Sequence, residues 1–447
     1  MKQYFSTDIA EYGYKDVKMH TMIAARRFRF LLSVIAAIII WASGCDKKPQ
    51  DATTTAEKTE KQTVLSDVPL APFQVELLEL AFDTAAAIPV YPHIKDRSRT
   101  QEAVVTACLK LGQPSRALSY IEQISNWRQG TGYADLALYC AQLGFGQKAR
   151  IYLDLANQIA EKSIQTDTAD GNVPQEWRTD QIKVKIAQAY AWLGQIEQAN
   201  QLEKGVVESE TAKVAGAKAL ACDEKTFDEQ VNSLETMIAQ GNFDITKNAL
   251  GAYAQLFKRF YPDEKRRLLI EEKIKASWGK MPIFIRIELL TDMAVSALEH
   301  NDQTKALSIV DEAQGLIDGN QWPVEIRIPM AANLVVLRFR AGDKEKAKSD
   351  ADALLGQYET EGSAIVNIYR AGALRPLAEA YQAMGDREVA LLVYKKAIKE
   401  GIENPNSRPR AEDLSATCCS MAMHVVEPDA ELWLQIHQVR KGLGQPW

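Results

Sequence analysis

The sequence predicts an all-α fold, an α-solenoid of about eight helical hairpins arranged as an open superhelix. From Pro72 to Trp447, apolar residues recur with the period of about 3.6 residues that is typical of amphipathic helices, and no segment alternates as a strand would. A second observation is a short turn pattern, glycine followed five residues later by alanine, which recurs along the same region. Helical hairpins repeated in this way stack on their neighbours and bury one continuous core.

Each turn begins with a residue suited to a left-handed backbone and ends with a small residue. Glycine ends the first helix in a left-handed backbone conformation that a Cβ disfavours, and asparagine is the next-best residue there. The alanine lets the second helix approach the first closely. The clear copies are Gly112–Ala117, Gly144–Ala149, Gly194–Ala199, Asn301–Ala306, Gly342–Ala347 and Gly385–Ala390. Gly241 begins a looser copy, and Val425 to Ala430 is a degenerate last copy. Because successive turns lie 32 to 60 residues apart, additional helices are expected near 209–221 and 263–277.

Positions flanking the turns repeat as well. Small residues stand seven positions before a turn, tyrosines four before it and large apolar residues nine after it: Ala137, Ala187, Ala294 and Ala378; Tyr190 and Tyr381; Ile121, Leu153, Val310 and Tyr394. This order of positions resembles the tetratricopeptide repeat, a helix-turn-helix unit of about 34 residues. The resemblance covers most of residues 97–440 and is best from Leu377 to Ala397. It implies a solenoid with an extended surface for binding other proteins.

The N-terminal segment predicts export. A basic cluster at residues 26–29 precedes an apolar run from Phe30 to Trp41, and Ala42-Ser43-Gly44 leads into Cys45. This segment resembles the signal peptide and lipobox of bacterial lipoproteins, which implies that Cys45 becomes the lipidated N-terminus of the mature protein. The alternative is an uncleaved membrane helix, but about a dozen apolar residues are too few for a span of ~20.

Three regions follow from this pattern. Residues 1–44 form the signal peptide, whose true start is Met19 or Met22 because acidic residues dilute the segment before them. Residues 45–70 are the lipidated cysteine and a flexible tether, since their polar composition cannot bury enough surface to fold. Residues 71–447 are the helical repeat domain, as one array or two domains. Asp46 resembles the signal by which many Gram-negative lipoproteins are retained at the inner membrane.

Composition argues against several functions. Residues 1–44 carry six basic and three acidic side chains of the 53 and 59 in the whole chain, so the remainder has a net charge of −9. A nucleic-acid partner is therefore not expected. No HExxH, GxSxG or Walker pattern occurs. We therefore expect no catalytic site, no bound metal and no cofactor. The five later cysteines lie in Ala- and Leu-rich segments and are expected to be buried without an essential disulfide: Cys108, Cys140, Cys222, Cys418 and Cys419.

An arginine stands 15 or 16 residues before each turn other than the looser copy at Gly241, near the start of the first helix of its hairpin. The seven are Arg97, Arg128, Arg178, Arg286, Arg327, Arg370 and Arg410. In one interpretation each donates to the last carbonyls of the preceding helix. In the other, they form a row of guanidinium groups for an acidic partner. Trp127, Trp177 and Trp322 precede these helices too, as structural wedges or as an aromatic platform.

The predicted function is a membrane-anchored lipoprotein that serves as a non-catalytic protein–protein interaction scaffold in the bacterial cell envelope. Its partners would be other envelope proteins or peptide segments, and its body would lie in the periplasm, outside the cytoplasmic membrane. One alternative is a glycan-binding envelope lipoprotein with aromatic platforms. Another is a carbohydrate-active enzyme on an α/α toroid, since a hidden pair of carboxylates would leave no motif.

Overall fold

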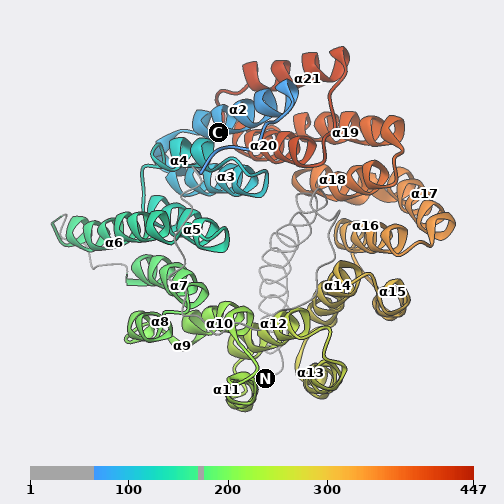
Figure 1. Ribbon diagram of the computed structural model, residues 1–447. Helices are drawn as coiled ribbons and strands as arrows, with labels where there is room; N and C mark the ends of the chain where they lie inside the picture. Colours follow the sequence, from blue (N-terminus) through green and yellow to red (C-terminus); the bar gives the residue numbers. More distant parts are fainter. Residues whose placement is uncertain (1–64, 170–175) are drawn as a thin grey trace, which may run out of the picture. The chain divides into compact units, whose positions relative to one another are not determined.

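The computed structural model describes residues 65–169 and 176–447 (Figure 1). The predicted signal peptide, Cys45 and the tether up to residue 64 lie outside the described residues. Within these ranges every regular element is a helix, which confirms an all-α fold of the solenoid type. The chain divides into two compact units. The first unit holds the described residues up to Asp223, with Asn406–Glu427 and Arg440–Trp447; the second holds Glu224–Pro405 and Pro428–Val439.

The first unit is built from helices at both ends of the described chain. They are α2 (Pro72–Ala87), α3 (Val90–Lys110), α4 (Pro114–Ile121), α5 (Arg128–Gln142), α6 (Gly146–Ala169), α7 (Glu176–Trp192), α8 (Ile196–Glu203), α9 (Glu208–Thr211), α10 (Ala215–Ala221) and α20 (Ser407–Met423). Consecutive hairpins pack side by side, because α5 contacts both its own partner α6 and the next first helix, α7.

The second unit repeats the same arrangement. Its helices are α11 (Phe227–Ala239), α12 (Phe243–Arg259), α13 (Glu264–Ser277), α14 (Ile283–Glu299), α15 (Gln303–Asp318), α16 (Val324–Arg340), α17 (Lys344–Glu361), α18 (Asn367–Ala383), α19 (Arg387–Ile402) and most of α21 (Ala430–Lys441). First helices α12, α14, α16 and α18 contact one another in sequence, and each packs against the helix that follows it. Helices are present in both regions where the sequence predicts additional ones, as α9, α10 and α13, but α13 is the hairpin partner of α12 and not an additional helix.

The turn pattern has the predicted backbone conformation. Positive φ angles occur at Gly112 (69°), Gly144 (82°), Gly194 (73°), Gly342 (100°), Gly385 (82°), Asn301 (58°) and Val425 (55°). Valine rarely adopts this region because its branched Cβ is crowded there, so the spacing of the repeat outweighs the local preference at Val425. The helix that follows is often capped as expected. For example, Asp302 accepts a hydrogen bond from the backbone N–H of Lys305 at 3.0 Å.

The small residues of the repeat lie in the core. Six of the seven turn alanines have no exposed surface: Ala117, Ala149, Ala199, Ala306, Ala347 and Ala390. Ala430, in the degenerate last copy, is exposed instead, because it is the first residue of α21. The five cysteines after Cys45 are all buried, as expected for small apolar residues. Among the described residues, no helix is both long and apolar enough to cross a bilayer.

Gly241 does not have the position that the sequence analysis gave it. It was expected inside a hairpin, but it connects α11 to α12. Since α12 contacts α14 as one first helix contacts the next, the turn within that hairpin is the segment Phe260–Asp263 before α13. The extra helices before α12 displaced the repeat frame, so a glycine with positive φ (75°) was assigned to the wrong connection.

The last residues assigned to the tether are ordered against the first turn. The backbone N–H of Val68 donates to the carbonyl of Gly112 at 2.9 Å, and Asp67 accepts a hydrogen bond from the N–H of Ser115 at 2.7 Å. A Cβ on Gly112 would lie 2.6 Å from Cγ2 of Val68, so the glycine is required for close approach as well as for its φ angle. The segment entering α2 is therefore fixed on the turn between α3 and α4.

Helices far apart in the sequence pack together in the first unit, where α20 contacts both α2 and α3 (Figure 1). Gln74 on α2 donates to the carbonyl of Ala422 at 2.8 Å. On α3, Arg99 binds Glu412 at 3.1 Å, and Arg408 of α20 binds Asp96 at 3.3 Å. The sequence analysis did not predict this contact, because an apolar helix face does not specify its partner.

Candidate functional site

A pocket of about 620 Å³ lies in the first unit, at the N-terminal ends of α5 and α7. Its apolar lining comes from four segments, namely α3, the loop before α5, α6 and α7. Those apolar residues are Ile94, Ile124, Trp127, Ile159 and Trp177. This volume lies in the range of ~300–1,000 Å³ that is common for ligand sites. We call it the Trp pocket.

The charged lining residues of the Trp pocket are all basic. They are Lys95, Arg128, Lys162 and Arg178, and the remaining polar lining residues are uncharged. No carboxylate is among the lining residues that the structure describes, although Glu102, just outside this lining, pairs with Arg128. The described lining of the Trp pocket is therefore basic, with the charge of Arg128 balanced by Glu102.

The two tryptophans of the pocket contact each other. Their ring centroids are 5.3 Å apart, and the ring planes meet at 79°, an edge-to-face arrangement. The guanidinium of Arg128 lies 4.6 Å from the ring centroid of Trp127, and that of Arg178 lies 5.7 Å from the ring of Trp177. In both cases the guanidinium of the arginine that follows the tryptophan in sequence lies over the tryptophan ring. Trp177 is 50% exposed, so its ring is only partly packed between the two hairpins.

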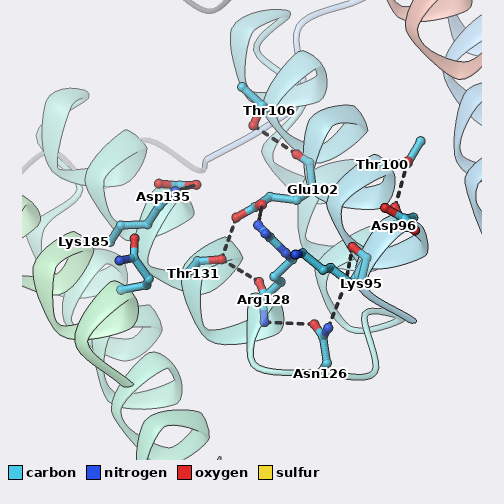
Figure 2. A network of polar contacts seen from close by, with 12 residues as sticks. Lys95, Asp96, Thr100, Glu102, Thr106, Asn126, Arg128, Thr131, Asp135 and Lys185 are labelled. Carbon is cyan, nitrogen blue, oxygen red and sulfur yellow. Dashed lines mark hydrogen bonds and ion pairs between the residues drawn. The ribbon is translucent and has the colours of Figure 1, made fainter. Parts of the chain in front are cut away.

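A polar network lies beside the pocket and holds Arg128 (Figure 2). Glu102 on α3 accepts a charged hydrogen bond from Arg128 and a hydrogen bond from Thr131 Oγ1 at 2.7 Å. Asn126 accepts from the backbone N–H of Arg128 at 3.0 Å and donates to Ser98 at 2.7 Å. These contacts attach the loop before α5 to α3, so the guanidinium of Arg128 has one defined orientation.

The network continues to an ion pair between Asp135 on α5 and Lys185 on α7 (Figure 2). Burial disfavours the charge on Lys185, but the carboxylates of Asp135 and Glu102 outweigh burial and raise the pKa of this lysine. Lys185 therefore stays charged and holds α7 against α5.

Close packing beneath the pocket depends on Gly130. A Cβ at this position would lie 2.8 Å from Cδ1 of Ile182 on α7 and 3.1 Å from Cγ2 of Ile159 on α6. The absence of a side chain lets α5, α6 and α7 meet where the two tryptophans join. The Gly130-Thr131-Gly132 segment was a signal for such an approach that the sequence analysis did not use.

The seven arginines do not make one uniform set of contacts. Three donate to carbonyls just before their own helix, as the bracing interpretation expects: Arg97 to Ala86 and Ile88, Arg286 to Met281, and Arg370 to Ser363 and Ile365. Arg327 instead contacts Gln357 and Asp318, and Arg410 donates to Ser407. Only two of the seven, Arg128 and Arg178, line the Trp pocket.

In the ranges that the structure describes, no group of three or more His, Cys, Asp or Glu side chains is placed to hold a metal ion. Trp322, the third tryptophan of the pattern, lies outside the Trp pocket and donates from Nε1 to the carbonyl of Ile317 at 3.0 Å, at the end of α15.

No protein-family model matches this chain, and no curated protein matches it. Among solved structures, the chain is similar to a circular tandem repeat protein with novel repeat topology and enhanced subunit contact surfaces. The identity is 15% over 83% of this chain and 94% of that chain, with a TM-score of 0.25.

Proposed function

We propose that this protein is a membrane-anchored lipoprotein that acts as a non-catalytic scaffold for protein–protein interaction in the bacterial cell envelope. The observation that carries the scaffold function is a helical-repeat fold with a preformed basic, aromatic pocket between successive hairpins. Helical repeats commonly use such surfaces to hold a peptide or another protein. The resemblance of the turn and its flanking positions to tetratricopeptide repeats supports the same function.

The membrane anchor rests on the sequence around Cys45. The basic cluster, the short apolar run and the small residues before this cysteine resemble a lipoprotein signal. Acylation would place the repeat domain outside the cytoplasmic membrane, and Asp46 favours retention at the inner membrane. A tethered scaffold meets its partners at a high local concentration, and this favours binding even when the interface itself gains no additional contacts.

Labelling with a clickable fatty acid tests the anchor. The wild-type protein should incorporate the label and sediment with membranes, whereas Cys45→Ala should remain unlabelled and appear in the soluble or unprocessed fraction. Cys108→Ala is the matched control, because this buried cysteine lies in the folded domain and should leave labelling unchanged. A wild-type protein without label would contradict the anchor.

A second candidate function is glycan binding. The observation in its favour is that Trp127 and Trp177, from successive hairpins, contact each other at one pocket. Calorimetric titration with envelope glycan fragments tests this function. Saturable heat that disappears in Trp177→Ala would favour it over the peptide scaffold.

A further inference from the structure

The turns within the hairpins differ between the two units at one position, the N-cap of the second helix. In the second unit this residue is an aspartate in all four hairpins: Asp263, Asp302, Asp343 and Asp386. Three of these aspartates accept a hydrogen bond from a backbone N–H in the first turn of the helix. Aspartate is among the residues that best cap a helix in this way.

The first unit has no aspartate at this position. The corresponding residues are Gln113 before α4, Phe145 before α6 and Gln195 before α8, and the carbonyl of each accepts from the N–H of the turn alanine, as in the second unit. Neither Gln113 nor Gln195 caps its helix with the side chain. Two carboxylates do lie beside these turns, namely Asp67, which accepts from the N–H of Ser115, and Glu197 in α8.

Exposed apolar side chains stand at the same turns. Leu143, directly before the turn glycine between α5 and α6, is 53% exposed, and Val68 beside Gly112 is 54% exposed. Around Leu143 the chain has no acidic residue from position 142 to position 153. We call the apolar residues of these turns the turn edge, which consists of Val68, Leu143, Phe145 and Ile196.

The three turns lie at one edge of the first unit. A Cβ on Gly112 would lie 3.7 Å from the hydroxyl of Tyr139, which is in the last turn of α5. Asp135 on α5 pairs with Lys185 on α7, and each stands nine residues before the glycine of its own turn. Since α5 and α7 pack together as successive first helices, their C-terminal ends are level.

The chain that follows Cys45 enters the fold at this edge. The described residues begin at Leu65, 20 positions after Cys45, and Val68 is held on the first turn by its backbone hydrogen bond to Gly112 and by the side chain of Gln113. A flexible chain of about 20 residues, as the sequence predicts here, spans ~25 Å root-mean-square. A lipid on Cys45 would therefore keep the turn edge close to a bilayer.

We propose that the turn edge of the first unit lies against the lipid bilayer, with Leu143 and Phe145 in the headgroup region. The proposal rests on the proposed anchor at Cys45 and names the surface that the anchored protein presents to the membrane. Exposed apolar side chains are stabilised when they leave water for the interface, whereas anionic headgroups repel carboxylates. Contact with a membrane accounts for both properties of these turns.

Fluorescence from a label at position 143 tests the proposal. The full chain with Leu143→Cys is purified from membranes, labelled with a nitrobenzoxadiazole maleimide and placed in vesicles of phosphatidylethanolamine and phosphatidylglycerol. The five cysteines of the folded domain are buried, so the dye should attach at the new site. Its emission should be quenched when the vesicles contain a phospholipid with a nitroxide near the headgroup.

Val207→Cys is the matched control, because Val207 is also an exposed apolar residue but follows the far end of α8. That helix has 8 residues and is about 12 Å long, so quenching at position 207 should be weaker. Equal quenching at the two positions, or none at position 143, would overturn the proposal. An emission shift to shorter wavelength at position 143 without quenching would also overturn it and would indicate that another segment of the chain covers the edge.

Phe145→Asp introduces the aspartate of the second unit and should weaken the membrane contact. With the label at position 143, its quenching should fall, while thermal melts should show that the variant remains folded. Phe145→Asn is the control, since asparagine caps a helix about as well without the charge, and it should lose less quenching. Unchanged quenching in Phe145→Asp would count against the proposal.

The wild-type chain separates this outcome from that of the anchor. An acylated Cys45 has no free thiol, so the wild type should take up no dye. If it stays unlabelled but position 143 is not quenched, the anchor stands and the turn edge fails. If the wild type is labelled at Cys45, the anchor fails, and quenching at position 143 in a Cys45→Ser background would still assign the turn edge to the membrane.

Discussion

Trp127 and Trp177 lie edge to face with their ring centroids 5.3 Å apart, although they are 50 residues apart in the sequence. Each stands at the N-terminal end of the first helix of its hairpin, so their contact joins two successive repeats. Each also carries the following arginine over its ring, which places two guanidinium groups at one pocket. A feature that recurs once per hairpin thus becomes a paired site where two hairpins meet.

The aromatic pair should contribute measurably to stability. Trp127→Ala and Trp177→Ala, with the double variant, form a mutant cycle whose coupling free energy is expected to be about 0.5–1.5 kcal/mol. Trp127→Ala should cost more than Trp177→Ala, because Trp177 is 50% exposed. Urea denaturation of the four proteins gives the coupling. A coupling of zero would mean that the rings are adjacent without interacting.

Removing Lys185 should destabilise the region beside the pocket. Lys185→Met leaves Asp135 partly buried beside Glu102 without its cation, and the expected loss is about 1–2 kcal/mol at pH 7 after allowance for partial exposure. The loss should shrink at acidic pH, because burial raises the pKa of Asp135 and protonation removes the uncompensated charge. Urea denaturation at both pH values checks this. Lys204→Met, at an exposed site, should change stability little.

Asp292 on α14 should make the second unit less stable at high pH. Burial, together with the nearby charge of Glu288, raises its pKa to about 7, and Lys258 only partly opposes this. The folded state therefore binds the proton more tightly than the unfolded state, so stability is lost as the pH rises from about 4 through 7. Asp292→Asn should raise the melting temperature at pH 8 and change it little at pH 4. Glu272→Gln, at an exposed position on α13, should show no such difference between the two pH values.

Two alanines of the turn pattern test the repeat frame. Ala390 has no exposed surface, so Ala390→Leu should overpack the contact between α18 and α19 and cost roughly 1–3 kcal/mol. Ala430, its counterpart in the degenerate copy, is exposed, and Ala430→Leu should be nearly neutral. Thermal melts followed by circular dichroism distinguish the two. Equal losses at both positions would show that Ala430 is packed like the other turn alanines.

Arg370 should contribute mainly to stability. It donates to the carbonyls of Ile365 and Ser363 at 2.8 and 3.0 Å and binds Glu400 at 3.3 Å. Arg370→Ala is expected to cost about 1–2 kcal/mol, because charged hydrogen bonds and stem packing are lost. Arg387→Ala is the comparison, since this arginine stands at the start of α19, outside the repeated arginine position. No loss of stability at Arg370 would leave the bracing interpretation without support.

Much of the fold followed from local chemistry. The turn residues could be found because a left-handed helix end needs glycine or asparagine, and the same spacing identified Val425 despite its unfavourable side chain. The buried alanines followed because close helix contacts need small residues. Gly241 was misplaced because its conformation does not reveal whether it lies within or between hairpins.

The candidate site was less accessible from the sequence. Its tryptophans and arginines were recognised as members of a repeat, but a repeat does not reveal which copies meet at a pocket. Asp135 and Lys185 gave no signal, because charged residues are common on helices and their pairing depends on the packing of α5 against α7. The docking of Val68 on Gly112 was also missed, since Val68 lies in a segment whose polar composition predicted a flexible tether.

Photo-crosslinking from the Trp pocket in native cells tests the tethered-scaffold function most directly. A photoreactive residue at position 129, which lines the pocket, should give discrete crosslinked products in the membrane fraction. The same residue at position 204, outside the pocket, should give none, and Cys45→Ala should abolish the membrane-associated products. Equal crosslinking from positions 129 and 204, or products that persist unchanged in Cys45→Ala, would contradict a membrane-tethered scaffold that binds its partner through this pocket.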